Sequence, residues 1–313
     1  MKKIIVYGVG TFGEAIFEFL KKRGCEKNII AFCDQNASNL KEFHEKPVLT
    51  LDEATKRSSL FLIAVGNAFY EEVETLLKKY DQIQYENIQQ FIKNNFAGNL
   101  TEFEREFCAL AHINGMDNYF RNAENKDAMS VFWKENGEFF RLFKLLNLEN
   151  IIELACGHGR HVPKYVDKAK HITLVDILEK NISFCKERFK NYENITYYKN
   201  NGSDLHDLPN NSYTALFTYD AMVHLELLDI AKYLEETYRV LKPNSMALFH
   251  HSNNDANYKA SYSTGSNGRS FMSSNIFAYL SYRVGFEIVE QKIIDWGVPN
   301  LDCLTLVYKG NTD

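Results

Sequence analysis

The sequence lacks the features of membrane proteins and of nucleic-acid-binding proteins. No apolar run in its 313 residues approaches the roughly 18 to 20 residues that a membrane span needs. The 36 Lys and Arg residues do not exceed the 41 Asp and Glu residues, so the net charge of -5 offers no attraction to a phosphate backbone. We therefore expect no membrane span and no nucleic-acid partner.

Signals for export and for metal binding are also missing. The apolar run at residues 4–7 is too short for a signal peptide and begins immediately after Lys3. The six cysteines are scattered, without a Cys-x-x-Cys pair or a Cys/His cluster, which is typical of reduced, buried thiols. Only 5 prolines accompany frequent Asn, Lys, Ile and Phe, a bias typical of AT-rich bacterial genomes. We expect a bacterial, cytoplasmic protein and assign no metal site.

What is present is the pattern of an α/β protein in more than one part. Short apolar runs at residues 3–7, 28–33 and 59–65 predict strands, and residues 70–77 predict a helix. This pattern stops at the polar, glycine-containing residues 94–99. We predict a small Rossmann-like α/β domain over residues 1–97.

The rest of the chain divides into a helical segment and a second α/β series. Residues 98–149 are predicted to form a helical connector that covers a ligand, and residues 150–313 a seven-stranded, doubly wound domain. Helices are expected between the first five strands and before the sixth, and the polar residues 252–270 are a candidate lid. The expected strands cover residues 151–155, 171–176, 195–199, 214–219, 245–250, 286–295 and 303–308.

A glycine-rich turn follows the first strand of the second series. It reads Glu-Leu-Ala-Cys-Gly-His-Gly-Arg-His over residues 153–161, and we expect it to open a helix. Gly157 and Gly159 let the backbone approach a ligand where a side chain would block it. Asp176 ends the next strand, 17 residues after Gly159, in position to accept hydrogen bonds from a ribose diol.

With these residues the sequence resembles the class I S-adenosylmethionine-dependent methyltransferases over about residues 130–310. Residues 203–209 are similar to the segment that contacts adenine in this family, residues 218–225 to its fourth-strand motif, and residues 238–243 to the approach to its fifth strand. Ala155 stands where many members have glycine. The resemblance implies S-adenosyl-L-methionine as cofactor, bound by Glu153, Ala155, Gly157, Gly159, Asp176, Ile177, Asp204, Leu205 and Tyr219.

Candidates for catalysis follow the fourth and fifth strands of this series. Methylation of a hydroxyl requires a base that removes a weakly acidic proton, and histidine suits this role. If Asp220 opens a helix, it shares a face with His224, which is either a base or a packed residue. Successive residues of a strand point oppositely, so at most one of His250 and His251 reaches the site. A divalent ion held by Asp220, a histidine and Asp255 is an alternative without a compact ligand motif.

A second glycine turn lies near the N-terminus. Gly8, Gly10 and Gly13 form a G-x-G-x-x-G sequence after the first strand, and Asp34 lies 21 residues beyond Gly13. By itself this pattern predicts an NAD site, although residues 1–97 leave little room for a second mononucleotide half. The domain is similar to small Rossmann-like modules of bacterial enzymes that modify nucleotide-linked sugars. Three roles follow: a docking or homodimerisation module, a nucleotide or nucleotide-sugar site, or an NAD site.

Together the two parts predict a transferase that O-methylates a sugar with a histidine base. The acceptor is a small molecule or glycan, such as a nucleotide-linked sugar or a surface-glycan precursor in capsule polysaccharide biosynthesis. Three alternatives stay open. They are an NAD-dependent oxidoreductase of a nucleotide sugar, a methyltransferase of a non-sugar small molecule, and a non-catalytic nucleotide-binding protein.

Overall fold

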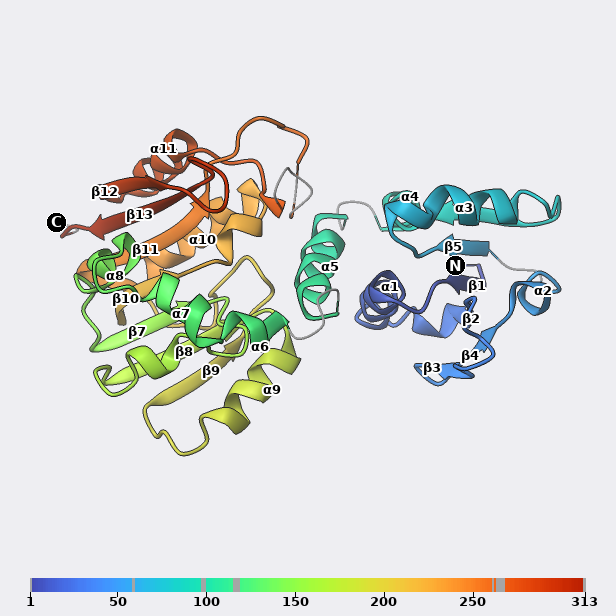
Figure 1. Cartoon of the computed structure of the whole chain (residues 1–313), viewed down its shortest axis with the longest axis horizontal. Coiled ribbons are helices and arrows are strands. Elements are labelled where there is room, and N and C mark those ends of the chain that lie inside the picture. The colour runs from blue at the N-terminus through green and yellow to red at the C-terminus, as the bar shows by residue number, and fades with distance from the viewer. Residues whose placement is uncertain are drawn as a thin grey trace. The chain divides into compact units, whose positions relative to one another are not determined.

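The computed structural model describes residues 2–57, 60–96, 100–114, 119–260, 262 and 268–311. The chain forms two compact units, Met1–Gly115 and Met116–Asp313, which are described separately (Figure 1). The expected boundary at residues 94–99 includes residues 97–99, which lie outside the described residues. So do Ser261 and residues 263–267 of the candidate lid.

The first unit is a six-stranded sheet with helices. Its strand order is β3-β4-β2-β1-β5-β6, and all neighbours are parallel except β3 and β4. β1 pairs with β2 on one side and with β5 on the other. The order in which successive strands are added to the sheet therefore reverses between β1 and β5. The elements are β1 (Ile4–Tyr7), α1 (Thr11–Lys21), η1 (Glu26–Asn28), β2 (Ile29–Cys33), β3 (Glu42–Phe43), β4 (Lys46–Leu49), α2 (Leu51–Ala54), β5 (Leu60–Ile63), α3 (Asn67–Leu77), β6 (Gln84–Asn87), α4 (Ile88–Asn95) and α5 (Leu100–Asn114).

The predicted α/β class of the first unit is confirmed, and three strands were not anticipated. β1, β2 and β5 are buried apolar runs, as the sequence indicates. β3 has two residues, β4 contains a proline, and β6 has the polar sequence Gln-Tyr-Glu-Asn. None of these has an apolar pattern, so pairing with neighbouring strands determines them.

Helix α5, from the predicted connector, packs on α1 within the first unit. The rings of Phe12 and Phe107 stack with centroids 4.0 Å apart, and Phe103 packs edge-on against Phe19. Lys22 also pairs with Glu106. These contacts bury one face of α5 against the aromatic face of α1.

The second unit is a seven-stranded sheet in the order β12-β13-β11-β10-β7-β8-β9, and only β13 runs antiparallel to its neighbours. All seven predicted strands are present. The elements are α6 (Tyr119–Ala123), α7 (Lys126–Phe132), α8 (Glu138–Phe143), β7 (Asn150–Leu154), η2 (Val162–Lys164), β8 (His171–Asp176), α9 (Glu179–Arg188), β9 (Ile195–Lys199), β10 (Tyr213–Thr218), η3 (Met222–His224), α10 (Leu227–Val240), β11 (Leu241–Ser252), α11 (Ser274–Val284), β12 (Glu287–Ile294) and β13 (Asp302–Lys309).

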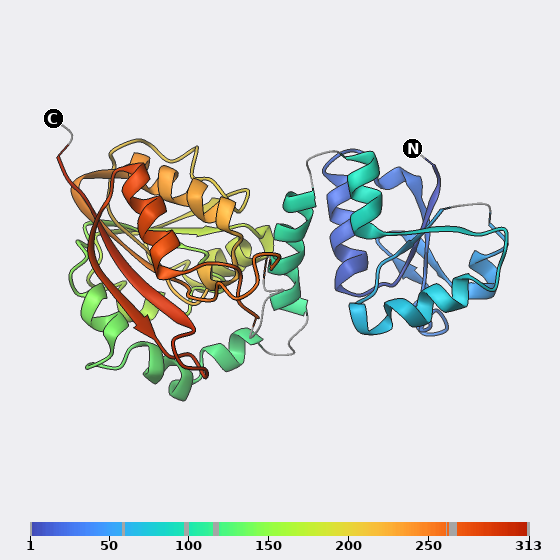
Figure 2. The ribbon, with the colours of Figure 1, turned by 90° about the horizontal axis from the view of Figure 1, so that it is seen from above.

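Helices cover both faces of this sheet and create two apolar layers. Residues of α7, α8 and α9 form one core with the sheet, and residues of α10 and α11 form the other (Figure 2). The parallel strands β7, β8 and β10 are buried on both faces, which explains their continuous apolar sequences. Their carboxyl ends meet at one edge, where the glycine turn lies.

Two predicted helices are absent. After the glycine turn there is only the three-residue 3₁₀ helix η2, because Pro163 lacks an N–H and disfavours a continuing α-helix. Residues 200–212, between β9 and β10, contain no helix. The side-chain oxygens of Asn200 and Asn201 accept hydrogen bonds from the backbone N–H groups of Gly202 and Ser203, and these bonds order the loop instead.

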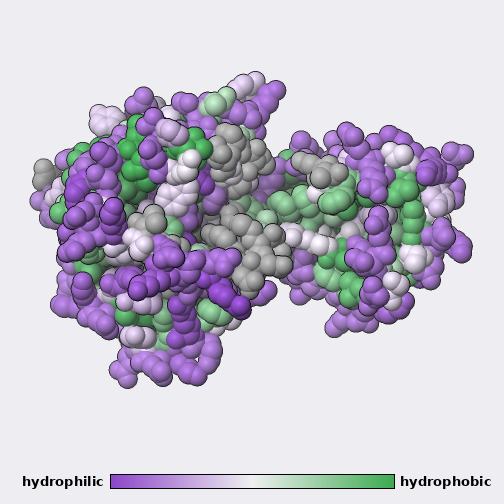
Figure 3. Space-filling view, in the orientation of Figure 1, coloured by the Kyte–Doolittle hydropathy of each residue, from purple (hydrophilic) through white to green (hydrophobic). Residues whose placement is uncertain are grey.

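The visible surface is mainly hydrophilic, with smaller apolar areas (Figure 3). Within the described ranges, we find no helix with the length and apolar character that crossing a bilayer requires.

Candidate active site

The glycine turn after β7 is held in a left-handed backbone conformation. Ala155, Gly157 and Gly159 have φ angles of 57°, 55° and 70°. A Cβ atom on Gly159 would lie 2.5 Å from a ring carbon of Phe189 in the segment after α9, so only glycine allows this packing. Ala155 adopts a backbone conformation that usually favours glycine.

Aromatic rings close over the outer side of this turn. His158 is stacked between Phe120 of α6 and Phe184 of α9, with centroid distances of 3.7 and 3.8 Å. A Cβ atom on Gly157 would lie 2.8 Å from the Phe120 ring. Arg188 joins the same contact by pairing with Glu124 at 2.6 Å and donating to the His158 carbonyl at 2.8 Å. The turn is therefore clamped between α6 and α9. The close approach that Gly157 and Gly159 were expected to allow a ligand is made here by the rings of Phe120 and Phe189.

Asp176 lies at the end of β8, beside the turn, as its position in the sequence predicts. Its carboxylate accepts from the Gly157 N–H at 2.9 Å, the Leu178 N–H at 2.9 Å and the Asn181 amide at 3.0 Å. Burial raises the pKa of Asp176, although these N–H groups act in the opposite direction. Ile177 follows, half-buried. Asp176 thus ties the turn to the neighbouring strand.

Glu153 is buried beneath the turn with one oxygen unused. Its Oε2 accepts from the Tyr165 hydroxyl at 2.6 Å, while Oε1 has no hydrogen-bond partner among the described residues. Burial raises the pKa of Glu153 to about 7, although the Tyr165 bond lowers it. An unpaired buried carboxylate oxygen is costly, and an ammonium group such as that of a bound amino-acid moiety would satisfy it. The residue therefore fits S-adenosylmethionine.

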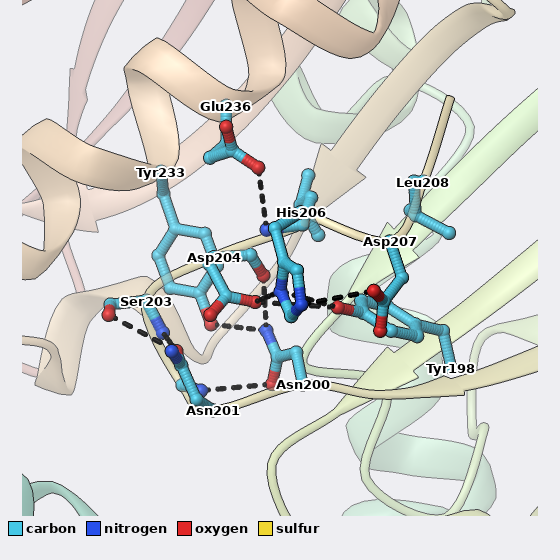
Figure 4. Close-up of polar contacts among 12 residues, drawn as sticks. Tyr198, Asn200, Asn201, Ser203, Asp204, His206, Asp207, Leu208, Tyr233 and Glu236 are labelled. Atoms are coloured by element: carbon cyan, nitrogen blue, oxygen red, sulfur yellow. Dashed lines mark hydrogen bonds and ion pairs between the residues drawn. The ribbon is translucent and has the colours of Figure 1, made fainter. Parts of the chain in front are cut away.

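The loop after β9 presents Asp204 at the same edge of the sheet (Figure 4). Its Oδ1 lies 3.4 Å from the Tyr198 hydroxyl and 3.2 Å from Nδ1 of the exposed His206. The hydrogen bond to Asp204 raises the pKa of His206. The amide of Asn200 donates to the Asp204 carbonyl at 3.0 Å and so fixes the loop.

Helix α10 holds the next residue of this loop. The buried Leu205 donates its N–H to Glu236 at 3.0 Å, and Arg239 donates to the Leu205 carbonyl at 2.7 Å. Glu236 and Arg239 also pair with each other at 2.7 Å. The loop that carries Asp204 and Leu205 is thus set by two charged residues that the sequence analysis did not identify.

Tyr219 and Asp220 follow β10, next to the glycine turn. The Tyr219 ring is buried and stacks on Phe139 at 3.8 Å. Asp220 has φ 55°, and its carboxylate accepts from Arg160 of the glycine turn at 2.8 Å. Asp220 therefore does not open an α-helix, and it shares no α-helical face with His224, because the left-handed turn and the short η3 intervene. Neither Asp220 nor Asp255 belongs to a cluster of three close metal-ligating side chains in the described parts of the chain.

His250 and His251 point to opposite faces of the sheet, as expected for successive strand residues. His250 is fully buried beside Tyr219 and Trp296. Its Nδ1 accepts from the Asp220 N–H at 3.0 Å, and its Nε2 lies 3.0 Å from Asp302. Both ring nitrogens are engaged, so this geometry argues against His250 as the base.

His251 lies in the other core layer. Its ring stacks on Phe277 at 3.9 Å, Nδ1 donates to the Ser252 carbonyl at 2.8 Å, and Nε2 bonds the Thr305 hydroxyl at 2.8 Å. Burial lowers the pKa of His251 to about 3. The structure thus places His251 away from the face that carries Asp220, and its low pKa also argues against a role as base.

His224 is the remaining histidine candidate, and it is less buried than His250 and His251. It ends η3 and is only partly buried. Nδ1 lies 2.7 Å from the Gly268 carbonyl oxygen, which can only accept, so the ring proton is on Nδ1. In the neutral ring Nε2 then carries the lone pair, the state in which a histidine accepts a proton.

The N-terminal glycine turn contains two closely packed glycines and one glycine with open space beside it. Gly8 has φ 116°, and a Cβ there would lie 2.4 Å from the Ala64 carbonyl oxygen. A Cβ on Gly13 would lie 2.3 Å from the Gly8 carbonyl oxygen, whereas a Cβ on Gly10 would meet no atom within 4 Å. Asp34 accepts from the Val9 N–H at 3.2 Å. Gly8 and Gly13 therefore serve packing, and Gly10 leaves open space at the turn.

Two family models match parts of the chain. Residues 151–244 match the family model described as a methyltransferase domain, and residues 3–70 match that of the PglD N-terminal domain. A search of curated proteins finds no match.

Solved structures are similar to part of the chain. A putative S-adenosylmethionine-dependent methyltransferase from Listeria monocytogenes is 15% identical, with 58% of this chain and 100% of that chain covered and a TM-score of 0.46. A Haloferax volcanii complex of the Trm112 methyltransferase activator and a putative methyltransferase is 14% identical. The match covers 63% of this chain and 97% of that chain, with a TM-score of 0.48. An S-adenosylmethionine-dependent methyltransferase from Mesorhizobium loti is 17% identical. The match covers 54% of this chain and 96% of that chain, with a TM-score of 0.44. Residues 151–244 are thus similar to methyltransferase domains, and residues 3–70 are similar to the PglD N-terminal domain.

Proposed function

We propose that the protein transfers a methyl group to a hydroxyl of a sugar, carried as a nucleotide-linked sugar or a surface-glycan precursor. The observation that supports this acceptor is the presence of a second glycine turn, open at Gly10, in the same chain as the methyltransferase turn. A match to the PglD N-terminal domain supports the same interpretation. S-adenosylmethionine supplies the methyl group on an electrophilic sulfonium.

The chain's own residues would bind the cofactor around the carboxyl ends of β7, β8 and β9. In this proposal Glu153 pairs with the amino group through its unused oxygen, and Ala155 begins the turn beside it. Asp176 and Ile177 meet the ribose, and Asp204 and Leu205 meet the adenine. Tyr219 forms the wall toward the acceptor.

His224 is the proposed base. As the base, His224 would accept the proton of the acceptor hydroxyl during methyl transfer. Substitution His224→Gln should lower turnover about 100-fold or more and leave affinity for S-adenosylhomocysteine within about twofold. Methyl transfer to the sugar found by an acceptor screen measures the first, and calorimetric titration the second.

The matched control is His171→Gln, at the amino end of β8 and thus at the opposite edge of the sheet. It should retain turnover. Unchanged turnover in His224→Gln would remove the histidine mechanism.

The cofactor proposal is tested by titrating the purified protein separately with S-adenosylhomocysteine and with NAD. Binding of the former alone supports the methyltransferase. Binding of NAD alone would support the oxidoreductase alternative and place the active turn at Gly8, Gly10 and Gly13.

The N-terminal turn offers a clean test of nucleotide binding. We propose that Gly8, Gly10, Gly13 and Asp34 hold a nucleotide-linked sugar. Gly10→Val fills open space at an extended backbone position with φ -79°, so folding should be retained while binding of nucleotide-linked sugars is lost. Circular dichroism and calorimetric titration measure the two effects. Retained binding in Gly10→Val would leave docking or homodimerisation as the role of this unit.

A further inference from the structure

A chain of buried polar groups runs from the end of the 252–270 segment to the glycine turn. Arg269 donates to both oxygens of Asp302, from Nε at 2.8 Å and from Nη2 at 2.7 Å. Asp302 Oδ2 lies 3.0 Å from His250 Nε2. Arg269 is 4% exposed, and Asp302 and His250 are 0% exposed. Three charged or titratable groups are thus removed from water together.

The hydrogen bonds fix which nitrogen of His250 carries the proton. The Asp220 N–H points at Nδ1 at 3.0 Å, so Nδ1 must be the acceptor. Nε2 therefore carries the proton and donates it to the Asp302 carboxylate. Burial raises the pKa of Asp302, but the bonds from His250 and Arg269 outweigh it and lower the pKa, which keeps the carboxylate charged.

His250 in this state supports a strained turn. Asp220 has φ 55°, in the left-handed region that residues with a side chain seldom adopt, although Asp is among those that do. The bond to His250 satisfies its N–H, and the carboxylate is directed to Arg160, whose guanidinium also lies over the Phe132 ring at 4.6 Å. Arg160 belongs to the glycine turn, so the chain of contacts ends at the turn that is proposed to bind the cofactor.

We propose that Asp302 and Arg269 are positioning residues of the methyl-transfer site. They fix the His250 tautomer, which accepts the Asp220 N–H and so keeps the Asp220 backbone in its turn. The Asp220 carboxylate is thereby kept paired with the Arg160 guanidinium in the glycine turn. This inference rests on the proposed function, because it assumes that S-adenosylmethionine binds there. Neither residue touches the reacting atoms.

The same two strands supply an internal comparison. His251 and Thr305 form a buried hydrogen bond between β11 and β13, like His250 and Asp302, but on the other face of the sheet. A purely structural role would make the two pairs equivalent. A positioning role predicts that only the pair containing Asp302 affects the charge at the cofactor turn.

The test compares Asp302→Asn with Thr305→Val by calorimetric titration. Two ligands are used: S-adenosylhomocysteine, which is neutral at sulfur, and sinefungin, which carries an amine where the cofactor carries its methyl sulfonium. In Asp302→Asn the Asn amide can donate to Nε2, which favours the other tautomer and opposes the Asp220 N–H. Sinefungin affinity should fall about fivefold or more relative to that for S-adenosylhomocysteine.

Thr305→Val should leave the ratio of the two affinities unchanged. A ratio in Asp302→Asn equal to that of the unmodified protein would overturn the proposal, and so would an equal change in Thr305→Val. If Asp302→Asn does not fold, Arg269→Lys serves, since it keeps the charge but loses the bidentate contact, and its ratio should fall in the same direction. If the unmodified protein binds neither ligand, the proposed function itself fails.

Discussion

At the scale of single residues, protonation of the Glu153 carboxyl is coupled to the free energy of unfolding. Burial raises its pKa to about 7, so the folded protein holds a proton that the unfolded chain releases near the ordinary value of 4.5. This contribution to the free energy of unfolding is complete below pH 4.5 and is lost as pH rises to about 7. Glu153→Gln should remove on the order of 3 kcal/mol of this pH dependence.

Urea unfolding of both proteins at pH 5 and pH 8 measures the difference. The expected result is a smaller decline toward pH 8 in Glu153→Gln. Affinity for S-adenosylhomocysteine should rise over the same range in the unmodified protein, because the carboxylate form pairs with the ligand's ammonium. Parallel pH dependence in the two proteins would contradict this account.

The residues of the site differ in how well the sequence predicts them. Glu153, Gly157 and Asp176 lie close together because one strand–turn unit and the next strand end carry them. Arg269 and Asp302 are 33 residues apart, and they meet because β13 pairs antiparallel with β11. That register depends on packing across the whole sheet, so no local pattern announces the pair. The same pairing buries His250, which the sequence analysis took for a candidate base.

At the scale of elements, a comparison of Gly159 with Gly297 distinguishes the cost of a left-handed backbone from the cost of close packing. Gly159 and Gly297 share φ 70°, but only Gly159 packs against Phe189, since a Cβ on Gly297 meets nothing within 4 Å. Gly297→Ala should cost about 1 to 2 kcal/mol for the backbone alone. Gly159→Ala should cost about 1 to 3 kcal/mol more, because α9 must shift.

Urea unfolding at one pH gives both values, and Gly297→Ala is the control for the backbone term. Equal losses in the two variants would mean that the segment around Phe189 yields without cost.

In the second unit, helices were harder to predict than strands for a physical reason. The central strands β7, β8 and β10 are buried on both faces and therefore have continuous apolar sequences, whereas a helix depends on its capping and on its interior residues. Pro163 ended the expected helix after the glycine turn at η2, and the loop of residues 200–212 is ordered by asparagine side chains. Both departures lie at the carboxyl edge of the sheet, where the ligand-binding loops are.

At the scale of the whole molecule, the two units have separate apolar cores. Two clusters belong to the first unit and two to the second. Calorimetric heating of the full chain should therefore show two transitions. S-adenosylhomocysteine at 100 times its Kd should stabilise one of them by about 2.7 kcal/mol and leave the other in place. A single transition that shifts as a whole would contradict this expectation.

The tryptophans, and hence the tryptophan fluorescence, are confined to one of the two units. The chain has only two, Trp133 and Trp296, and both pack against the core that contains α7 and α8 in the second unit. Tryptophan emission therefore originates entirely from the second unit, and the first unit contributes nothing to that signal. A fluorescence change on adding a nucleotide-linked sugar would then report an event in the second unit, whether by direct binding there or by communication from the first.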